Sequence, residues 1–265
     1  MASSLPDSTA NATRLLVAGE PAPFSVLNPG AASRLLLVAD HAGREIPRRL
    51  ANLGLSANAL ERHIAWDIGV AGLGEQLTAL LDATLIAQRY SRLVIDCNRH
   101  PERADAICEA SDETEIPGNV GLSTESRTQR VEAVFAPYHA RIAAELDARM
   151  AAGARPLVVA LHSFTPVMGP APRPWRFGVL HLGGSPFSEA MLSQLRAAFG
   201  ADLVGDNEPY RMDGTDYTIP WHAVRRGLDY LELEVRQDLI GDEDGQTDIA
   251  EQLAPLLKAA AVQCA

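Results

Sequence analysis

The chain has 265 residues and a formal net charge of −11 at pH 7, because 34 acidic residues outnumber 23 basic ones. A negatively charged surface opposes the binding of nucleic acids and anionic membranes, which are themselves polyanions. The three cysteines, Cys97, Cys108 and Cys264, lack metal-site spacing, and their odd number favours free thiols in a reducing compartment over a disulfide framework.

The N-terminal residues are polar, rich in alanine and serine, and interrupted by prolines. They lack the basic start and apolar core of a signal peptide, and the chain has no apolar run of the ~18 residues that a membrane helix needs. We therefore expect a flexible segment over residues 1–24, a single domain over 25–265, and a cytoplasmic protein.

Short apolar runs alternate with amphipathic stretches along the rest of the chain. Apolar runs bounded by turn residues are typical of strands buried on both faces, and they predict strands over 34–40, 84–97 (as one or two strands), 156–163, 176–184, 203–210 and 228–240. Apolar residues at helical spacing predict helices over 57–82, 124–152 (with Ser123 as N-cap), 186–199 and 247–261. Residues 100–122 read as a long polar loop. This alternation predicts an α/β fold whose sheet is covered by helices on both faces.

Polar residues follow three of the predicted strands directly. They are Asp40 with His41, the run from Asp96 to His100, and His162 with Ser163. In open α/β sheets, ligands bind beyond the carboxyl ends of the strands. We therefore expect these three clusters to meet at one site.

His41 and His162 each end an apolar run. Two histidines and one carboxylate form a common catalytic zinc set, which leaves one position open for water. Alternatively, each histidine bonds to nearby backbone and has only a structural role. The residues alone leave both interpretations open.

The carboxylate that would complete a zinc set is either Glu45 or Asp67. Glu45 follows His41 by four residues in a predicted loop. Asp67 follows His63 by four residues, so the two would share one face of a predicted helix, with a mutually bonded structural pair as the alternative. Asp40 points away from its neighbour in an extended backbone, and we expect it to orient a ligand from behind.

Asn98 and Arg99 suit a substrate carboxylate, because a guanidinium binds it bidentately and an amide adds a donor. A structural ion pair of Arg99 with Asp96 or Glu102 is the alternative.

Glu232 and Glu234 fall on the same side of the last predicted strand. Burying a carboxylate is costly without a cation nearby, so we expect a metal or Arg236 close to them. One of the two would serve as general base for a metal-activated water. Walker, GxSxG and HExxH motifs are absent, which argues against several other enzyme classes.

Six short segments, in this order, resemble the N-formylglutamate amidohydrolase family. They are DHAGREIP (40–47), HIAWDIG (63–69), SRLVIDCNRHP (91–101), LHS (161–163), GDNEPY (205–210) and LEVRQDL (233–239). The resemblance spans residues 33–242. It implies a carboxypeptidase-like, three-layer α/β/α fold with a mostly parallel or mixed sheet, similar to zinc carboxypeptidases and aspartoacylase-type enzymes. It also implies a hydrolase that uses a metal-bound water.

The resemblance implies roles for particular residues. Those that would bind or orient a single divalent ion, expected to be Zn²⁺, are His41, His162, Asp67 (with Glu45 as the alternative), Asp40 and His63. Glu234 matches a glutamate that the family carries near the chain end, and we expect it to be the general base, with Glu232 as the weaker candidate. The residues expected to bind substrate are Asn98, Arg99, His222 and Arg225, and a second substrate carboxylate would need a further cation from Arg173, Arg176, Arg225 or Arg236.

The leading hypothesis is therefore a metal-dependent amidohydrolase that acts on an N-formyl or small N-acyl amino acid. Its type reaction would convert N-formyl-L-glutamate to formate and L-glutamate. The alternatives are a carboxypeptidase-like enzyme or a deacylase for another N-acyl amino acid, and a non-catalytic binding protein on the same fold. Each implies a small anionic ligand in a locally positive cleft of an acidic protein.

Overall fold

A seven-stranded sheet runs through the computed structural model, which describes residues 14–264. Its order is β1-β3-β2-β6-β11-β9-β10. The strands are β1 (Phe24–Leu27), β2 (Leu35–Ala39), β3 (Thr84–Gln88), β6 (Leu157–Phe164), β9 (Phe177–Leu180), β10 (Val204–Asp206) and β11 (Tyr230–Arg236). Only the β1–β3 and β9–β11 pairs of this sheet are antiparallel, which confirms the prediction of a mostly parallel sheet.

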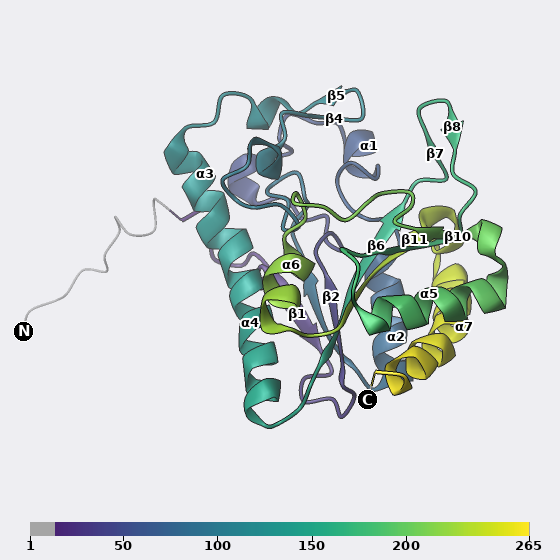
Figure 1. Cartoon of the computed structure of the whole chain (residues 1–265). Helices are drawn as coiled ribbons and strands as arrows, with labels where there is room; N and C mark the ends of the chain where they lie inside the picture. Colours follow the sequence, from purple (N-terminus) through teal and green to yellow (C-terminus); the bar gives the residue numbers. More distant parts are fainter. Residues whose placement is uncertain (1–13, 265) are drawn as a thin grey trace, which may run out of the picture.

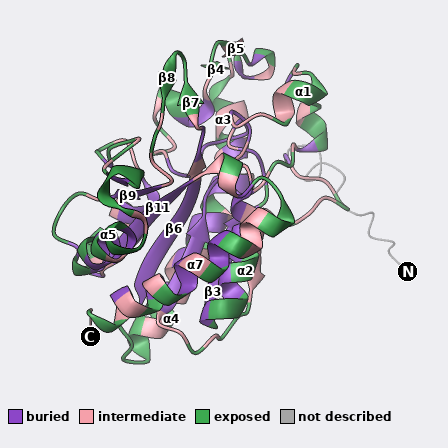
Figure 2. Ribbon diagram, turned by 90° about the vertical axis from the view of Figure 1, so that its right-hand side faces the viewer, coloured by how far each residue is buried: buried purple, intermediate pink, exposed green. Residues whose placement is uncertain are grey.

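Helices cover both faces of the sheet (Figure 1). One layer consists of α2 (Val70–Leu81), α5 (Pro186–Phe199) and α7 (Glu243–Val262), and the other is formed mainly by α4 (Ala136–Ala151) and α6 (Thr218–His222). In β2, Leu35 and Leu37 pack into the core on the first side, whereas Leu36 and Val38 pack into the core on the second. Side chains alternate across a strand, so an uninterrupted apolar run supplies both cores. Figure 2 shows the resulting buried strands between helices with exposed outer faces.

The predicted helix over 57–82 is two helices in the structure. Residues Ala57–Leu60 form the single turn α1, and α2 begins only at Val70. Between them the backbone bonds to other segments: Asp67 N–H donates to the His41 carbonyl at 2.9 Å, and Arg92 N–H donates to the Ala65 carbonyl at 3.2 Å. Gly69 then adopts φ +83°, a left-handed conformation that suits glycine, at the start of α2. The single-helix prediction is therefore wrong, although both of its ends are helical.

The predicted helix over 124–152 is also interrupted. It consists of α3 (Thr124–Arg130), a π-helical turn over Val131–Phe135, and α4. Pro137 has no N–H to donate to the preceding turn, which is a recognised cause of such an irregularity. Ser123 caps α3 as predicted, because its side chain accepts a hydrogen bond from Ser126 N–H.

The remaining differences lie mostly in loops. The apolar run over 84–97 forms one strand, β3, and residues beyond it form an irregular segment that reaches the pocket described below. The sequence does not predict the edge strand β1, because its four residues are too few to show a clear apolar or alternating pattern. The polar loop over 100–122 contains a small hairpin, β4 (Ala110–Ser111) with β5 (Thr114–Glu115), and the connection between β6 and β9 contains another, β7 (Val167–Met168) with β8 (Ala171–Pro172).

The predicted N-terminal segment 1–24 is described only in part, because residues 1–13 lie outside the described residues. Within the described part, Leu15 is buried and the Pro21 carbonyl accepts a hydrogen bond from the Tyr90 hydroxyl. None of the helices formed by residues 14–264 combines the length and the apolar character needed to cross a membrane.

Candidate active site

A pocket of about 600 Å³ lies at the carboxyl ends of β2, β6 and β11. The polar clusters that follow the predicted strands meet here, as their positions predicted. The lining residues from these clusters are His41, Asp96, Asn98, Arg99, His162 and Ser163. The pocket walls also include residues 105–112 around the β4–β5 hairpin and 210–216 from the loop before α6.

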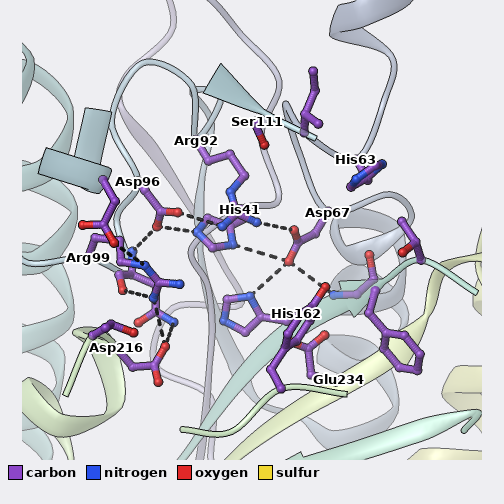
Figure 3. Close-up of a pocket in the computed structure, with 18 of the residues that line it drawn as sticks. His41, His63, Asp67, Arg92, Asp96, Arg99, Ser111, His162, Asp216 and Glu234 are labelled. Atoms are coloured by element: carbon purple, nitrogen blue, oxygen red, sulfur yellow. Dashed lines mark hydrogen bonds and ion pairs between the residues drawn. The ribbon is translucent and has the colours of Figure 1, made fainter. Parts of the chain in front are cut away.

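His41, Asp67 and His162 form a buried group that could hold a metal ion, with one ligand atom from each within 4.8 Å of the others. The Asp67 Oδ2 atom lies 3.0 Å from His162 Nδ1 and 3.5 Å from His41 Nδ1. Figure 3 shows both imidazoles turned toward this carboxylate. His41 Nδ1 is buried without a hydrogen-bond partner among the described residues. Two imidazole nitrogens and a carboxylate suit Zn²⁺, and the unpartnered nitrogen fits a metal ligand.

A carboxylate lies on the far side of each imidazole. His41 Nε2 lies 2.7 Å from Asp96 Oδ1, within hydrogen-bond distance. His162 Nε2 lies 3.5 Å from Asp40 Oδ2, an ion-pair distance at which neither atom has a hydrogen-bond partner among the described residues. Such contacts fix the ring orientation of metal-binding histidines. Asp40 therefore lies behind His162, where the sequence placed an orienting residue without specifying its partner.

Arg92 bridges the two carboxylates that flank His41. Its guanidinium lies 3.3 Å from Asp67 Oδ1 and 2.7 Å from Asp96 Oδ2. Burial alone would raise the pKa of Asp67, but the charges and hydrogen bonds of His41 and His162 hold it well below its usual value. Asp67 is thus an ionised carboxylate, and, against the effect of burial, the neighbouring carboxylates in turn raise the pKa of His41 and of His162. Metal binding would replace the protons of these imidazoles. Sequence reasoning missed Arg92, although it precedes Asp96 by four residues in a segment that carries the family resemblance.

Two residues named for the metal centre from sequence lie elsewhere. Glu45 is exposed and lines a separate pocket beside Arg89, so it does not complete the histidine pair as the alternative prediction required. His63 lines the rim of the main pocket, 3.6 Å from Asp112. The predicted helical pairing of His63 with Asp67 is wrong, because the segment between α1 and α2 is not helical.

Asn98 and Arg99 line the pocket but already have protein partners. The Asn98 side-chain carbonyl accepts hydrogen bonds from the Tyr217 and Thr218 N–H groups at 3.0 and 2.9 Å. Arg99 lies 3.0 Å from Asp216 Oδ1 and 3.8 Å from Asp105 Oδ2, so its ion pairs are with neither Asp96 nor Glu102. These contacts join the loop after β3 to the start of α6.

Several predicted substrate-binding residues do not line this pocket. His222 is buried, with Nε2 2.9 Å from His139 Nδ1, and Arg225 lies over the Trp221 ring at 3.7 Å. The other candidate cations, Arg173, Arg176 and Arg236, are also absent from its lining. Arg211 does line the pocket, and within residues 14–264 it forms no ion pair with a carboxylate. It lies in a loop with no periodic pattern, so sequence alone did not single it out.

Glu232 and Glu234 both face the pocket from β11, as strand alternation predicted. Glu234 pairs in register with His162 on β6, and its Oε2 atom has no hydrogen-bond partner among the described residues. Burial raises the pKa of Glu234 to about 7. Burial also raises the pKa of Glu232 well above its usual value; His162 opposes this shift, whereas Asp216 and Glu234 add to it.

A family model described as N-formylglutamate amidohydrolase matches residues 33–241. The chain belongs to this family. Membership of the N-formylglutamate amidohydrolase family confirms the prediction of an enzyme that hydrolyses amide bonds. The matched range includes all of the pocket residues named above.

Two solved structures share the fold of this chain. The crystal structure of gene product Atu2144 from Agrobacterium tumefaciens is 38% identical, with a TM-score of 0.91 and coverage of 95% of this chain and 99% of that chain. An N-formylglutamate amidohydrolase from Ralstonia eutropha JMP134 shares the fold at 21% identity, with a TM-score of 0.68 and coverage of 91% and 98%, respectively. No curated protein matches the chain.

Proposed function

We propose that this chain is a Zn²⁺-dependent enzyme that releases the acyl group from an N-formyl or other small N-acyl amino acid. N-formyl-L-glutamate, which gives formate and L-glutamate, is the type substrate for the first assay. The observation that carries the proposal is the buried His41–Asp67–His162 group with the free oxygen of Glu234 in the same pocket.

The metal would be held by His41, Asp67 and His162. Asp96 lies behind the His41 ring and Asp40 behind the His162 ring, where they would help to orient them. Bound there, a divalent ion would supply Lewis acidity, which lowers the pKa of water and polarises a carbonyl oxygen. Arg92 keeps Asp67 and Asp96 in place and offsets part of their negative charge.

Glu234 is the group in this pocket best suited to move a proton. A general base works best when its pKa lies near the operating pH, and burial brings the pKa of Glu234 to about 7. Its Oε2 atom is not engaged by another described residue. Glu234 would accept a proton from water and donate it to the leaving amine.

A substrate carboxylate would be bound by one of two arginines that line the pocket, Arg99 and Arg211. Arg99 would have to share its contact with Asp216, whereas Arg211 has no ion pair to give up. A guanidinium binds a carboxylate through two parallel hydrogen bonds and so fixes the scissile amide relative to Glu234.

The deciding experiment combines metal analysis with a product assay. Protein purified without chelator is expected to contain zinc and to release formate from N-formyl-L-glutamate or a related N-formyl amino acid. A protein that holds no divalent ion, and that zinc does not activate toward any N-acyl amino acid, would refute the proposal. Amine release from N-acetyl substrates and dipeptides distinguishes the deacylase and carboxypeptidase-like alternatives.

The predictions of a cytoplasmic location, of a small anionic substrate, and of no nucleic-acid or membrane partner stay predictions from the sequence.

A further inference from the structure

His162, one of the three proposed metal ligands, has a buried carboxylate behind it. Its Nδ1 atom lies 3.0 Å from Asp67 Oδ2, on the side of the other proposed ligands, whereas its Nε2 atom lies 3.5 Å from Asp40 Oδ2. His162 and Asp40 are both buried, so bulk water does not hold either side chain in place. The orientation of the His162 ring therefore depends on the groups that hold Asp40.

Thr218, the first residue of α6, contacts Asp40 from a distant part of the chain. Its hydroxyl donates a hydrogen bond to Asp40 Oδ1 at 2.8 Å, and the same hydroxyl oxygen lies 3.5 Å from the Cys97 carbonyl oxygen. The shorter contact is to a carboxylate, and hydrogen bonds to charged acceptors are the stronger ones. Because Oδ1 is engaged in this way, the other oxygen of Asp40 stays directed at His162 Nε2.

The surroundings of Thr218 fix its position. The residue is fully buried, and its backbone N–H donates to the Asn98 side-chain carbonyl at 2.9 Å. The next residue, Ile219, is also fully buried in the core on this side of the sheet. A β-branched side chain such as threonine has few accessible χ1 rotamers. The hydroxyl therefore has little freedom to turn away from Asp40.

We propose that Thr218 is a positioning residue of the metal centre, which fixes Asp40 so that Asp40 holds the His162 ring in the orientation that binds the ion. This rests on the proposed function. Thr218 does not line the pocket, so it acts through Asp40 and not on the substrate. Loss of a group behind a metal-binding histidine typically weakens metal binding ~10–100-fold. Because Thr218 is one contact further away, we expect a loss at the lower end of this range.

The test measures the Kd for Zn²⁺ by competition with a zinc-binding dye, which requires no turnover. Thr218→Val keeps the shape of the side chain but removes the hydroxyl, and we expect it to raise Kd about tenfold. Thr218→Ala, which places no extra methyl group beside Asp40, should have a similar effect. Thr218→Ser keeps the hydroxyl and should bind Zn²⁺ within about twofold of the wild type.

Thr78→Val is the matched control. Thr78 is a buried threonine whose hydroxyl also donates a hydrogen bond of 2.8 Å, but to the Gly74 carbonyl within α2, and it does not line the pocket. Its replacement should change Kd by less than twofold. A loss as large as that of Thr218→Val would mean that Zn²⁺ binding responds to any buried threonine, and would contradict the proposed role.

A double-mutant cycle tests the path through Asp40. Asp40→Ala alone should raise the Kd for Zn²⁺, and adding Thr218→Val to it should change Kd by less than twofold, because the group on which Thr218 acts is already missing. An unchanged Kd in Thr218→Val, an equal loss in Thr218→Ser, or a full tenfold loss on top of Asp40→Ala overturns this inference and leaves the proposed function intact. A wild type that binds no divalent ion refutes the proposed function and this inference together.

Discussion

Residues around the metal-binding group hold one another in place through shared contacts. Arg92 touches both Asp67 and Asp96, Asp96 touches His41, and Asp67 lies between the two histidines. A carboxylate that is fixed from several sides loses little side-chain freedom when it binds an ion. This arrangement separates the ligands from Glu234, whose free oxygen leaves it available for proton transfer.

Replacing Glu234 tests its role as base. Glu234→Gln should lower kcat by roughly 10²–10⁴-fold, because an amide cannot accept the proton. In the wild type, the base works only when it is ionised. Activity should therefore fall as pH decreases, with a midpoint at or below the pKa of about 7, since a bound cation favours the carboxylate. Steady-state rates from pH 5 to 9 measure this. An unchanged kcat in the variant would remove Glu234 from the mechanism.

Replacing His41 tests the metal centre. His41→Ala should reduce bound zinc from roughly one equivalent to a small fraction, because it removes one of three protein ligands. Glu45→Ala is the matched control, since Glu45 lies four residues away, is exposed and lines another pocket. It should keep its metal. Elemental analysis after dialysis gives the answer, and equal zinc in both variants would contradict the assignment.

At the scale of elements, the segment between α1 and α2 places Asp67 against His41. Its backbone bonds to His41 in the loop after β2 and to Arg92 in the loop after β3, in place of helical bonds. The conformation depends on Gly69, where a Cβ atom would collide with the Ile240 carbonyl oxygen and side chain. Asp67, a proposed metal ligand, is two residues away, so we expect backbone strain at Gly69 also to affect the site.

Gly69→Ala is expected to destabilise the fold by about 1–3 kcal/mol, through a left-handed conformation and a close contact. Gly153→Ala is the control, because Gly153 has φ +84° but a Cβ atom there would meet no other atom within 4 Å. It should show only the smaller cost of the left-handed conformation. Urea unfolding measures the loss of stability in both variants. Equal losses would mean that the close approach of Gly69 to Ile240 contributes nothing to the cost of the substitution.

The sequence predicted elements well where one pattern extends over a whole element. The buried runs of β2 and β6 and the periodic helix α5 lie where expected. Their shared strand ends also predicted that His41 and His162 would meet. Patterns failed where tertiary contacts replaced local ones, as between α1 and α2. Whether Arg211 and the Glu232 Oε2 atom are available to a ligand depends on which neighbouring side chains are already paired with others. A sequence does not show such pairing between distant segments.

At the scale of the whole molecule, the site joins parts of the chain that are far apart in sequence. The proposed metal ligands come from the loop after β2, from the turn before α2 and from β6, so an ion bound there would connect both halves of the parallel sheet. Such an ion stabilises only the folded chain, and its effect grows with the logarithm of its free concentration.

Removing the metal should therefore lower the thermal stability. When the free ion concentration is a thousand times Kd, a bound ion adds about 4 kcal/mol to the free energy of unfolding. For a domain of this size, this corresponds to an increase of roughly 10 °C in Tm. Calorimetry with EDTA, followed by addition of zinc, measures the loss and its recovery. The His41→Ala variant should show no response to either reagent. A Tm that EDTA leaves unchanged in the wild type would argue against an ion at this site.

The change of strand direction at β9 bears on how this architecture can vary. Since β6 runs toward the pocket and β9 runs away from it, residues 165–176 connect the two strands at the pocket end without crossing either core. This connection carries the exposed β7–β8 hairpin, and its residues Thr165 and Met168 already line the pocket. Each doubling of loop length costs only ~0.6 kcal/mol in closure entropy. Insertions here could therefore enlarge, narrow or cover the entrance at low cost, while the buried ligands keep their positions.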